Sequence, residues 1–301
     1  MQSQTQAPND ASMGDRTVSF EGIGTHWVID TAKPIGPAVR AEILDCVESF
    51  DRRWSRFRPD SLVTRIARGE VDQMVLPDED IALFELYDRL SDLTHGAVDP
   101  LVGAQLEHWG YDASYSLRPK PGRPPRDQSW ETALVRQGGQ LQVKQPVTID
   151  FGAAGKGFLV DRIAAILAKA GHADVLVDGS GDMRRSGSGT TRVGLEHPFA
   201  ERSVIGVADL GVNALCASAT NRRAWGDGLH HVLDARSGDP VRKVVATWVT
   251  AASATVADGL ATALFFVPAA QLRPHFDFEA VRMFVDGTAE RTTNFPGTLF
   301  T

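Results

Sequence analysis

The feature that most constrains the fold of this 301-residue chain is the irregular order of its helical and strand-like segments. Apolar residues recur at helical spacing in some stretches, while other apolar runs are short and alternate like strands. These segments do not follow the strict βαβ alternation of a doubly wound parallel sheet. The pattern therefore predicts an α+β fold, with mixed or antiparallel sheets and packed helices.

Four helices and eight strand-like runs are expected. The helices should span 37–54, 78–93, 158–170 and 254–266, with Gly96 ending the second and Ser253 capping the fourth. The strand-like runs are 17–30, 141–144, 146–151, 175–178, 192–198, 203–210, 230–235 and 244–253. Turns rich in glycine and proline separate many of them.

The polar N-terminal segment, residues 1–16, is expected to be a disordered tail. Residues 17–301 are expected to form a single folded unit; two subdomains with a ligand site between them are the alternative. RPKPGRPPR at 118–126 is too rich in proline for regular structure and should be a loop. Because the N-terminus lacks the apolar core of a secretory signal, the sequence predicts a cytoplasmic protein.

Charge and composition exclude several classes of partner. A net charge of −7 argues against nucleic acid, which needs a basic surface. No run of about 18 apolar residues is long enough for a transmembrane helix. Cys46 and Cys216 lie far apart and form no metal-binding motif, so reduced thiols are expected.

The segment IDFGAAGKGFLVD, residues 149–161, has features of an anion site. A strand, a turn of small residues and a helix start would present free backbone N–H groups to a phosphate. Lys156 adds a positive charge. The spacing matches neither a Walker A loop nor GxGxxG, so a tight strand-to-helix turn without a ligand is the alternative.

Asp258 and Thr262 in VADGLATALFF are spaced i, i+4 and share one helix face. A carboxylate and a hydroxyl among small residues suit a hard cation such as Mg²⁺. The alternative is an aspartate favoured by the helix dipole and a threonine bonded to a carbonyl of its own helix.

Three further segments could contribute to a site. In LHHVLDARSGDP, the tandem His230 and His231 on a strand would face opposite sides, so one of them could act as a base. The segment 94–112 could hold a planar heterocycle or pack on itself as a compact loop. Phe57 lies between two arginines, so an exposed ring flanked by charges is possible.

Taken in order, these segments resemble the ApbE family of FAD:protein FMN transferases, from about Gly22 to Phe266. HGAVDPLVGAQLEHWGY is similar to the family's GAxDxTVGPLxxLWGF, and TIDFGAAGKGFLVDR to D-x-G-x-x-x-K-G-x-x-x-D. The segments Gly24-Thr25, SRFRPDSLVTRI, DGSGDMRRSG, HHVLDARSGDPV and VADGLATALF resemble the remaining motifs. The fold expected from this resemblance is ApbE-like.

The resemblance implies the following site. Mg²⁺ would be held by Asp258, the Thr262 hydroxyl and the backbone oxygen of Ala153. The candidate base would be His231, with Asp234 nearby. The residues implied to contact FAD are Ile23, Phe57, Ala97, Val98, Asp99, Asp150, Lys156 and Leu233.

The implied reaction is Mg²⁺-dependent transfer of FMN from FAD to a Ser or Thr hydroxyl of an acceptor protein, with release of AMP. Asp258 and His231 would be its catalytic residues. An FAD pyrophosphatase that gives FMN and AMP, and a non-catalytic FAD-binding protein, are the alternatives. Ile23 stands where the family has Met, and Ala235 and Ser237 where Pro and Thr are usual. The last two changes are expected to loosen the turn near His231.

Overall fold

The largest sheet of the molecule has eight strands in the order β1-β2-β6-β7-β10-β15-β16-β17. The computed structural model describes residues 16–125, 129–137 and 139–300. All neighbouring strands of this sheet are antiparallel. Their bounds are Thr17–Gly22 (β1), Thr25–Thr31 (β2), Val175–Asp178 (β6), Asp182–Ser186 (β7), Ala214–Ala219 (β10), Val244–Ala251 (β15), Glu279–Phe284 (β16) and Ala289–Arg291 (β17).

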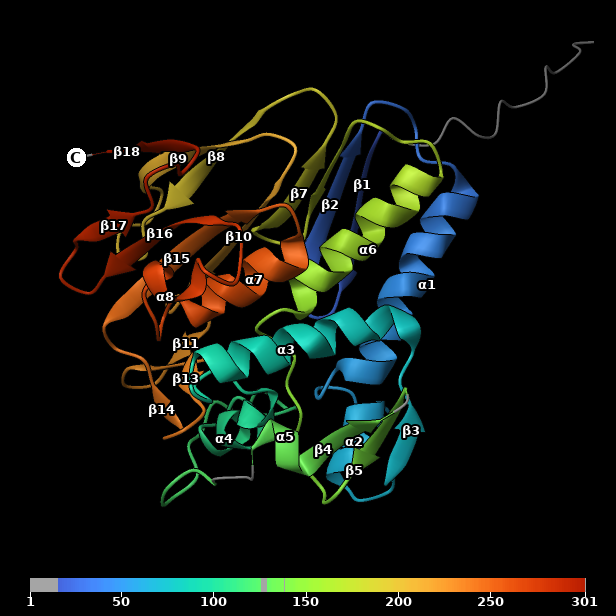
Figure 1. Cartoon of the computed structure of the whole chain (residues 1–301), viewed down its shortest axis with the longest axis vertical. Helices are drawn as coiled ribbons and strands as arrows, with labels where there is room; N and C mark the ends of the chain where they lie inside the picture. The colour runs from blue at the N-terminus through green and yellow to red at the C-terminus, as the bar shows by residue number, and fades with distance from the viewer. Residues whose placement is uncertain (1–15, 126–128, 138, 301) are drawn as a thin grey trace, which may run out of the picture.

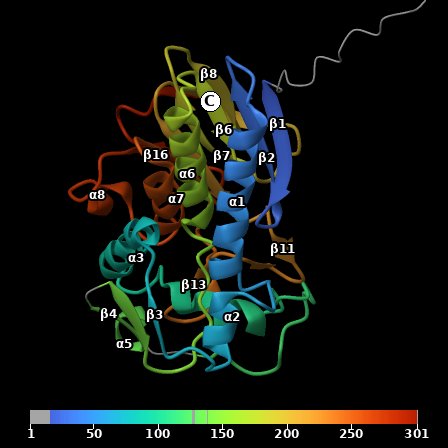
Figure 2. The same ribbon diagram turned by 90° about the vertical axis from the view of Figure 1, so that its right-hand side faces the viewer.

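Three helices cover one face of this sheet: α1 (Pro37–Trp54), α6 (Gly155–Lys169) and α7 (Ala254–Ala263). Helix α3 (Ile81–Leu93) crosses below them and packs on α7 (Figures 1 and 2). The amphipathic spacing predicted for α1 is observed, because its buried residues Ile43, Val47, Phe50 and Trp54 lie three or four positions apart. They join the main hydrophobic core between helices and sheet.

A smaller antiparallel sheet, in the order β18-β9-β8, packs on the opposite face of the large sheet. Its strands are Thr191–Glu196 (β8), Val204–Leu210 (β9) and Gly297–Leu299 (β18). Leu195 and Leu210 of this layer share a second core with Trp248 and Val281. Strand β15 is therefore covered on both faces, and all eight of its residues are buried.

The lower part of Figure 1 holds a three-stranded antiparallel sheet and several short elements. Its strands are Gln73–Val75 (β3), Leu134–Gln137 (β4) and Gln140–Val143 (β5). Its short helices are Leu62–Ala67 (α2), Asp78–Asp80 (η1), Pro100–Val102 (η2), Gly103–His108 (α4) and Trp130–Ala133 (α5). A further short helix, Ala269–Leu272 (α8), follows α7 in the sequence. Two small ladders pair Ala224–Trp225 (β11) with Leu229–His230 (β12), and Leu233–Asp234 (β13) with Asp239–Pro240 (β14).

The α+β prediction is confirmed, and the strand pairings among the described residues are all antiparallel. Several details of it are wrong, among them the end of the helix expected at 254–266, which ends at Ala263. Residues 146–151 form no strand, the run 230–235 is split between β12 and β13, and α6 begins at Gly155 rather than at residue 158. The chain leaves α3 at His95, which has a φ of 53°, one residue before the expected Gly96.

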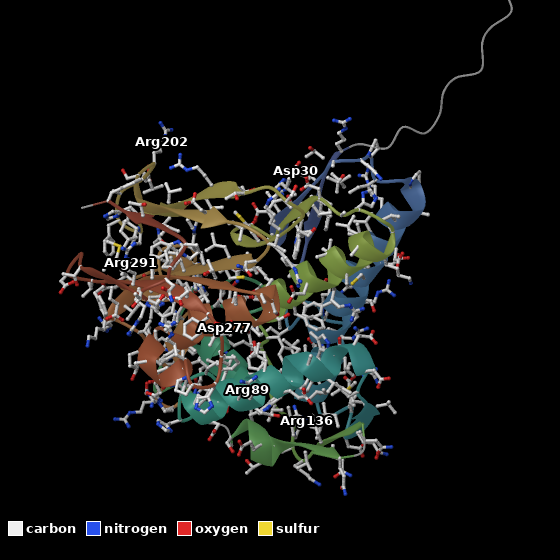
Figure 3. All side chains as sticks on the ribbon, turned by 45° about the horizontal axis from the view of Figure 1, so that its top comes forward. Asp30, Arg89, Arg136, Arg202, Asp277 and Arg291 are labelled. Carbon is white, nitrogen blue, oxygen red and sulfur yellow. The ribbon has the colours of Figure 1, made fainter. Side chains whose placement is uncertain are left out.

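The expected tail lies outside the described residues except for Arg16, whose carbonyl accepts a hydrogen bond from Thr31 N at 2.9 Å. The described part of the Pro-rich loop, 118–125, holds neither helix nor strand. The division of the chain into domains stays a prediction. Charged side chains such as Asp30 and Arg202 lie at the surface (Figure 3), and none of the described helices is long and apolar enough to cross a bilayer.

Candidate active site

A cavity of about 410 Å³ is lined by residues of α1, α6, α7 and β10 and of the loops that precede η2 and β13. Such a volume is typical of a site for a small ligand. The segments that line it lie far apart in sequence, from the β1–β2 turn to α7. All twelve residues proposed from the sequence as site residues line this cavity: Ile23, Phe57, Ala97, Val98, Asp99, Asp150, Ala153, Lys156, His231, Leu233, Asp258 and Thr262.

The β1–β2 turn contributes Ile23 to the cavity wall. Gly22 pairs with Thr25, which leaves a two-residue turn of Ile23 and Gly24. Both turn residues have positive φ, 46° and 74°. This is the twist that a tight hairpin requires, but a β-branched residue adopts it under strain. The turn therefore holds Ile23, a residue of the cavity wall, in a costly backbone conformation.

Asp150 is fixed just before α6 by three hydrogen bonds. Its backbone N–H donates to Pro100 O at 2.7 Å, and its Oδ1 accepts from Gly152 N at 2.7 Å. Its Oδ2 accepts from Arg56 Nε at 2.5 Å. Burial alone would raise the pKa of Asp150, but the charge and hydrogen bond of Arg56 outweigh it and lower that pKa. Asp150 is therefore an ionised, immobilised acceptor.

Arg56 is a buried residue of the site that the sequence analysis did not select. Its Nη1 donates to Tyr111 O at 2.7 Å, and its guanidinium lies 4.2 Å from the centroid of the Phe57 ring. Its Nη2 has no hydrogen-bond partner among the described residues. The sequence signal that could have identified Arg56 is its position next to Phe57 in SRFRP. Its contact with Asp150, 94 positions away, cannot be predicted from local spacing.

Phe57 and Tyr111 give the cavity an aromatic wall, and two further rings pack against them. Tyr111 stacks on Trp225 with centroids 5.6 Å apart, and Phe57 meets Tyr111 edge-on at 5.4 Å. Tyr115 stacks on Phe57 at 5.0 Å and 9°. The Phe57 ring is thus packed against other rings instead of freely exposed. Such a wall suits a planar aromatic ligand.

The segment 94–112 contains η2 and α4, so it is not a loop throughout, and its Ala97, Val98 and Asp99 line the cavity. Asp99 caps η2 by accepting from Leu101 N at 2.8 Å. The Ala97 carbonyl, in turn, accepts from Ala235 N at 3.1 Å, and Gln105 Nε2 donates to the Ala235 carbonyl at 2.8 Å. The segment therefore packs on the turn that follows Leu233.

Hydrogen bonds close that turn despite its unusual residues. The Asp234 carbonyl accepts from Ser237 N at 3.1 Å and from Gly238 N at 2.7 Å. Ala235 also supplies the N–H that bonds to Ala97, which a proline could not do. The bond from Ala235 N, which a proline could not donate, therefore adds to the two bonds that close the turn, and the expected loosening stays a prediction.

Asp258 lies in α7, which Ser253 caps as predicted by accepting from Val256 N. Asp258 Oδ2 accepts from Gly157 N of α6 at 2.9 Å. Thr262 Oγ1 lies 3.5 Å from the Ala153 carbonyl oxygen. The two side chains therefore share a helix face that points at the start of α6, and the Ala153 oxygen lies beside them.

These oxygens fit a small hard cation. They comprise one carboxylate, one hydroxyl and one carbonyl, and Mg²⁺ is typically bound by one or two carboxylates together with waters and substrate phosphates. No cluster of three His, Cys, Asp or Glu that could hold a metal is present within the described residues. Burial, followed by the charge of Asp182, raises the pKa of Asp258, so a cation would relieve a real electrostatic cost.

Lys156 forms an ion pair with Asp182, which is fully buried. Burial would lower the pKa of Lys156, but the Asp182 and Asp258 charges raise it, so the amine stays charged. Asp182 belongs to the DGSGDM turn noted in the sequence, yet it was not selected as a site residue. The positive charge of Lys156 is already balanced inside the protein.

The two histidines separate as predicted. His230 is buried, with Nε2 2.9 Å from the Val241 carbonyl, and is structural. His231 lies between β12 and β13 and lines the cavity. Burial, and then the charge of Arg223, lowers the pKa of His231 to about 3, so its ring is neutral at pH 7. A neutral ring can accept a proton.

The model of the ApbE family matches residues 23–280. The chain belongs to the ApbE family. This confirms the identification made from the motifs. The chain is 26% identical over 286 residues to the FAD:protein FMN transferase of Klebsiella pneumoniae, covering 86% of this chain and 81% of that one. It is also 26% identical over 245 residues to the enzyme of that name from Vibrio cholerae, covering 75% and 72%.

Solved structures of the family share the fold. The ApbE protein of Thermotoga maritima superposes with a TM-score of 0.79 at 24% identity, covering 92% of this chain and 97% of that one. The flavin transferase ApbE of Vibrio cholerae gives a TM-score of 0.78 at 22% identity, covering 93% and 97%. The predicted ApbE-like α+β architecture is therefore confirmed.

Proposed function

We propose that this ApbE-family chain transfers FMN from FAD to a Ser or Thr hydroxyl of an acceptor protein, in a Mg²⁺-dependent reaction that releases AMP. The observation that carries the proposal is the meeting of three features in one cavity: an aromatic wall, a set of hard oxygen ligands and a neutral histidine. The names of the curated relatives support the same reaction class.

The flavin ring would lie against the aromatic wall, beside Ile23 and Leu233. Asp150 and Asp99 would accept hydrogen bonds from the ring or its ribityl chain. Because Arg56 holds Asp150 in place, this acceptor does not have to reorganise when FAD binds. The diphosphate would then extend toward Lys156, Asp258 and Thr262.

The acceptor hydroxyl oxygen would attack the phosphorus of the FMN half. A new P–O bond forms as the P–O bond to the AMP phosphate breaks, and AMP leaves with that electron pair. The hydroxyl proton would pass to the His231 ring, which the diphosphate charge makes more basic than it is in the empty cavity. The product is FMN joined to the acceptor by a phosphoester.

Asp258, Thr262 and the Ala153 carbonyl would hold the Mg²⁺ ion. When bound, the ion would neutralise charge on the diphosphate and improve AMP as a leaving group. The Asp258 carboxylate is positioned before any ion arrives, because Gly157 N already donates to one of its oxygens.

The test incubates the purified protein with FAD and MgCl₂, with and without a cell extract as the source of acceptor. AMP is measured by chromatography, and covalent flavin by in-gel fluorescence and mass spectrometry. Transfer predicts AMP and a flavinylated Ser or Thr only with extract. AMP and free FMN without extract would indicate a pyrophosphatase, and tight FAD binding without AMP would indicate a non-catalytic protein.

A further inference from the structure

The arginine and lysine side chains that line the cavity differ in whether an acidic side chain balances their charge. Arg56 pairs with Asp150, Lys156 with Asp182, and Arg222 with Glu196. Arg223 also lines the cavity, but it makes no ion pair and no side-chain hydrogen bond with any residue that the structure describes. It is therefore the lining cation whose charge remains available to a ligand.

Arg223 is held at the cavity by its neighbours in sequence. It directly precedes β11, and Trp225 of that strand stacks on Tyr111 and donates from Nε1 to Trp109 O at 2.9 Å. The Arg223 guanidinium lies 5.8 Å from the centroid of the Tyr111 ring. Its backbone is thereby anchored while its side chain stays only half-buried.

Arg223 lines the same cavity as Asp150, His231 and Asp258. Asp150 lies on the proposed flavin side and Asp258 on the proposed metal side. A cation in a cavity that both sides share can meet the diphosphate that links the two halves of FAD.

We propose that Arg223 binds the diphosphate of FAD and stabilises the negative charge on the departing AMP phosphate. This inference rests on the proposed function. A guanidinium presents a planar fork of donors that matches two phosphate oxygens, and charge-assisted hydrogen bonds of this kind are among the strongest in proteins. Asp182 already neutralises the charge of Lys156, so the uncompensated positive charge for the diphosphate comes from Arg223.

Binding of three flavins tests the inference without any turnover. Riboflavin has no phosphate, FMN has one and FAD has two, so flavin fluorescence titrations of Arg223→Gln separate phosphate binding from ring binding. We expect FAD affinity to fall about 10- to 100-fold, FMN affinity to fall less, and riboflavin affinity to stay unchanged. Arg223→Lys should retain part of the FAD affinity.

The control is Arg192→Gln, which removes an exposed arginine of β8 that pairs with Asp209 outside the cavity. Unchanged FAD affinity in Arg223→Gln, or an equal loss for riboflavin, would overturn the inference. If wild-type protein forms no AMP but Arg223→Gln still loses FAD affinity selectively, the proposed function fails and the inference stands. If the variant keeps both transfer and FAD affinity, the inference fails and the proposed function stands.

Discussion

Gly157 N donates to Asp258 Oδ2 at 2.9 Å, joining the first turn of α6 to α7 across 101 positions of the sequence. The two helices meet here almost backbone to backbone. A Cβ atom at position 157 would lie 2.1 Å from the Ala254 carbonyl oxygen and 2.7 Å from Asp258 Cβ. The position of the proposed metal ligand thus depends on a residue that has no side chain.

Gly157→Ala should therefore damage both stability and the proposed metal site. The methyl group must push α6 and α7 apart, which should cost about 1–3 kcal/mol of unfolding free energy. Mg²⁺-dependent turnover should fall more steeply than flavin binding. Gly211→Ala is the matched control, because a Cβ there meets open space. Equal stability of the two variants in urea unfolding would contradict the tight crossing.

Asp258→Asn tests the metal site while keeping an acceptor for Gly157 N. Wild-type protein should melt at a higher temperature with MgCl₂ than with EDTA, because an ion that binds only the folded state stabilises it. The variant should lose this difference together with at least about 100-fold of its turnover. Because burial and the Asp182 charge already disfavour the ionised Asp258 carboxylate, the stability of the variant in EDTA should match or exceed that of wild type. If the variant still melted at a higher temperature with MgCl₂ than with EDTA, the metal would have to bind at a site other than Asp258.

Arg56→Met leaves Asp150 ionised, nearly buried and without its partner. Breaking a buried pair in this way should cost about 3 kcal/mol of unfolding free energy. Removing the carboxylate as well, in Arg56→Met/Asp150→Asn, should recover much of that loss. Denaturant unfolding of wild type and both variants measures this loss of unfolding free energy and its recovery. A double variant no more stable than the single one would show that Arg56 acts through packing on Phe57 instead.

The low pKa of His231 makes stability depend on pH. A histidine has an ordinary pKa near 6.5, and burial lowers that of His231 to about 3 in the folded state. Between these values the unfolded chain binds the proton and the folded chain does not, so acid favours unfolding. His231→Gln removes this effect. The stability of wild type relative to the variant should fall by up to about 1.4 kcal/mol per pH unit from about pH 6 to about pH 4. A constant difference would argue against a buried neutral ring.

Ile23→Asn should raise the unfolding free energy and weaken the use of FAD. Asn accepts positive φ more readily than a β-branched residue and makes the favoured Asn-Gly hairpin turn, so the variant should gain up to about 1 kcal/mol. It also replaces an apolar surface of the proposed flavin site, so the KM for FAD should rise. Thermal melts and steady-state kinetics measure the two effects, and a lower melting temperature would show that the turn is not strained.

Local patterns predicted the parts of the site that depend on short spacing. The i, i+4 relation of Asp258 and Thr262, and the Ser253 cap, are set within one helix and are observed as expected. Family motifs supplied the other site residues that were named from the sequence. Arg56 and Arg223 were missed, because their importance comes from partners, or from the lack of one among the described residues, that only the tertiary structure brings together.

The strand expected at 146–151 failed for a related reason. Its apolar residues Val147 and Ile149 are buried, which explains the alternation, but no neighbouring strand among the described residues pairs with it. Asp150 N bonds to Pro100 O instead. An alternation of apolar and polar residues indicates which side chains are buried, but it does not show which groups the backbone hydrogen-bonds to.

The cavity draws its walls from segments that lie as far apart in sequence as Ile23 and Thr262. No half of the chain contains the whole site, so partial unfolding of either end would release a ligand. FAD and Mg²⁺ should therefore stabilise the folded state of the whole molecule, and this stabilisation should increase with their concentration. Under this linkage, the amount of intact enzyme in a cell would follow the supply of its own substrate.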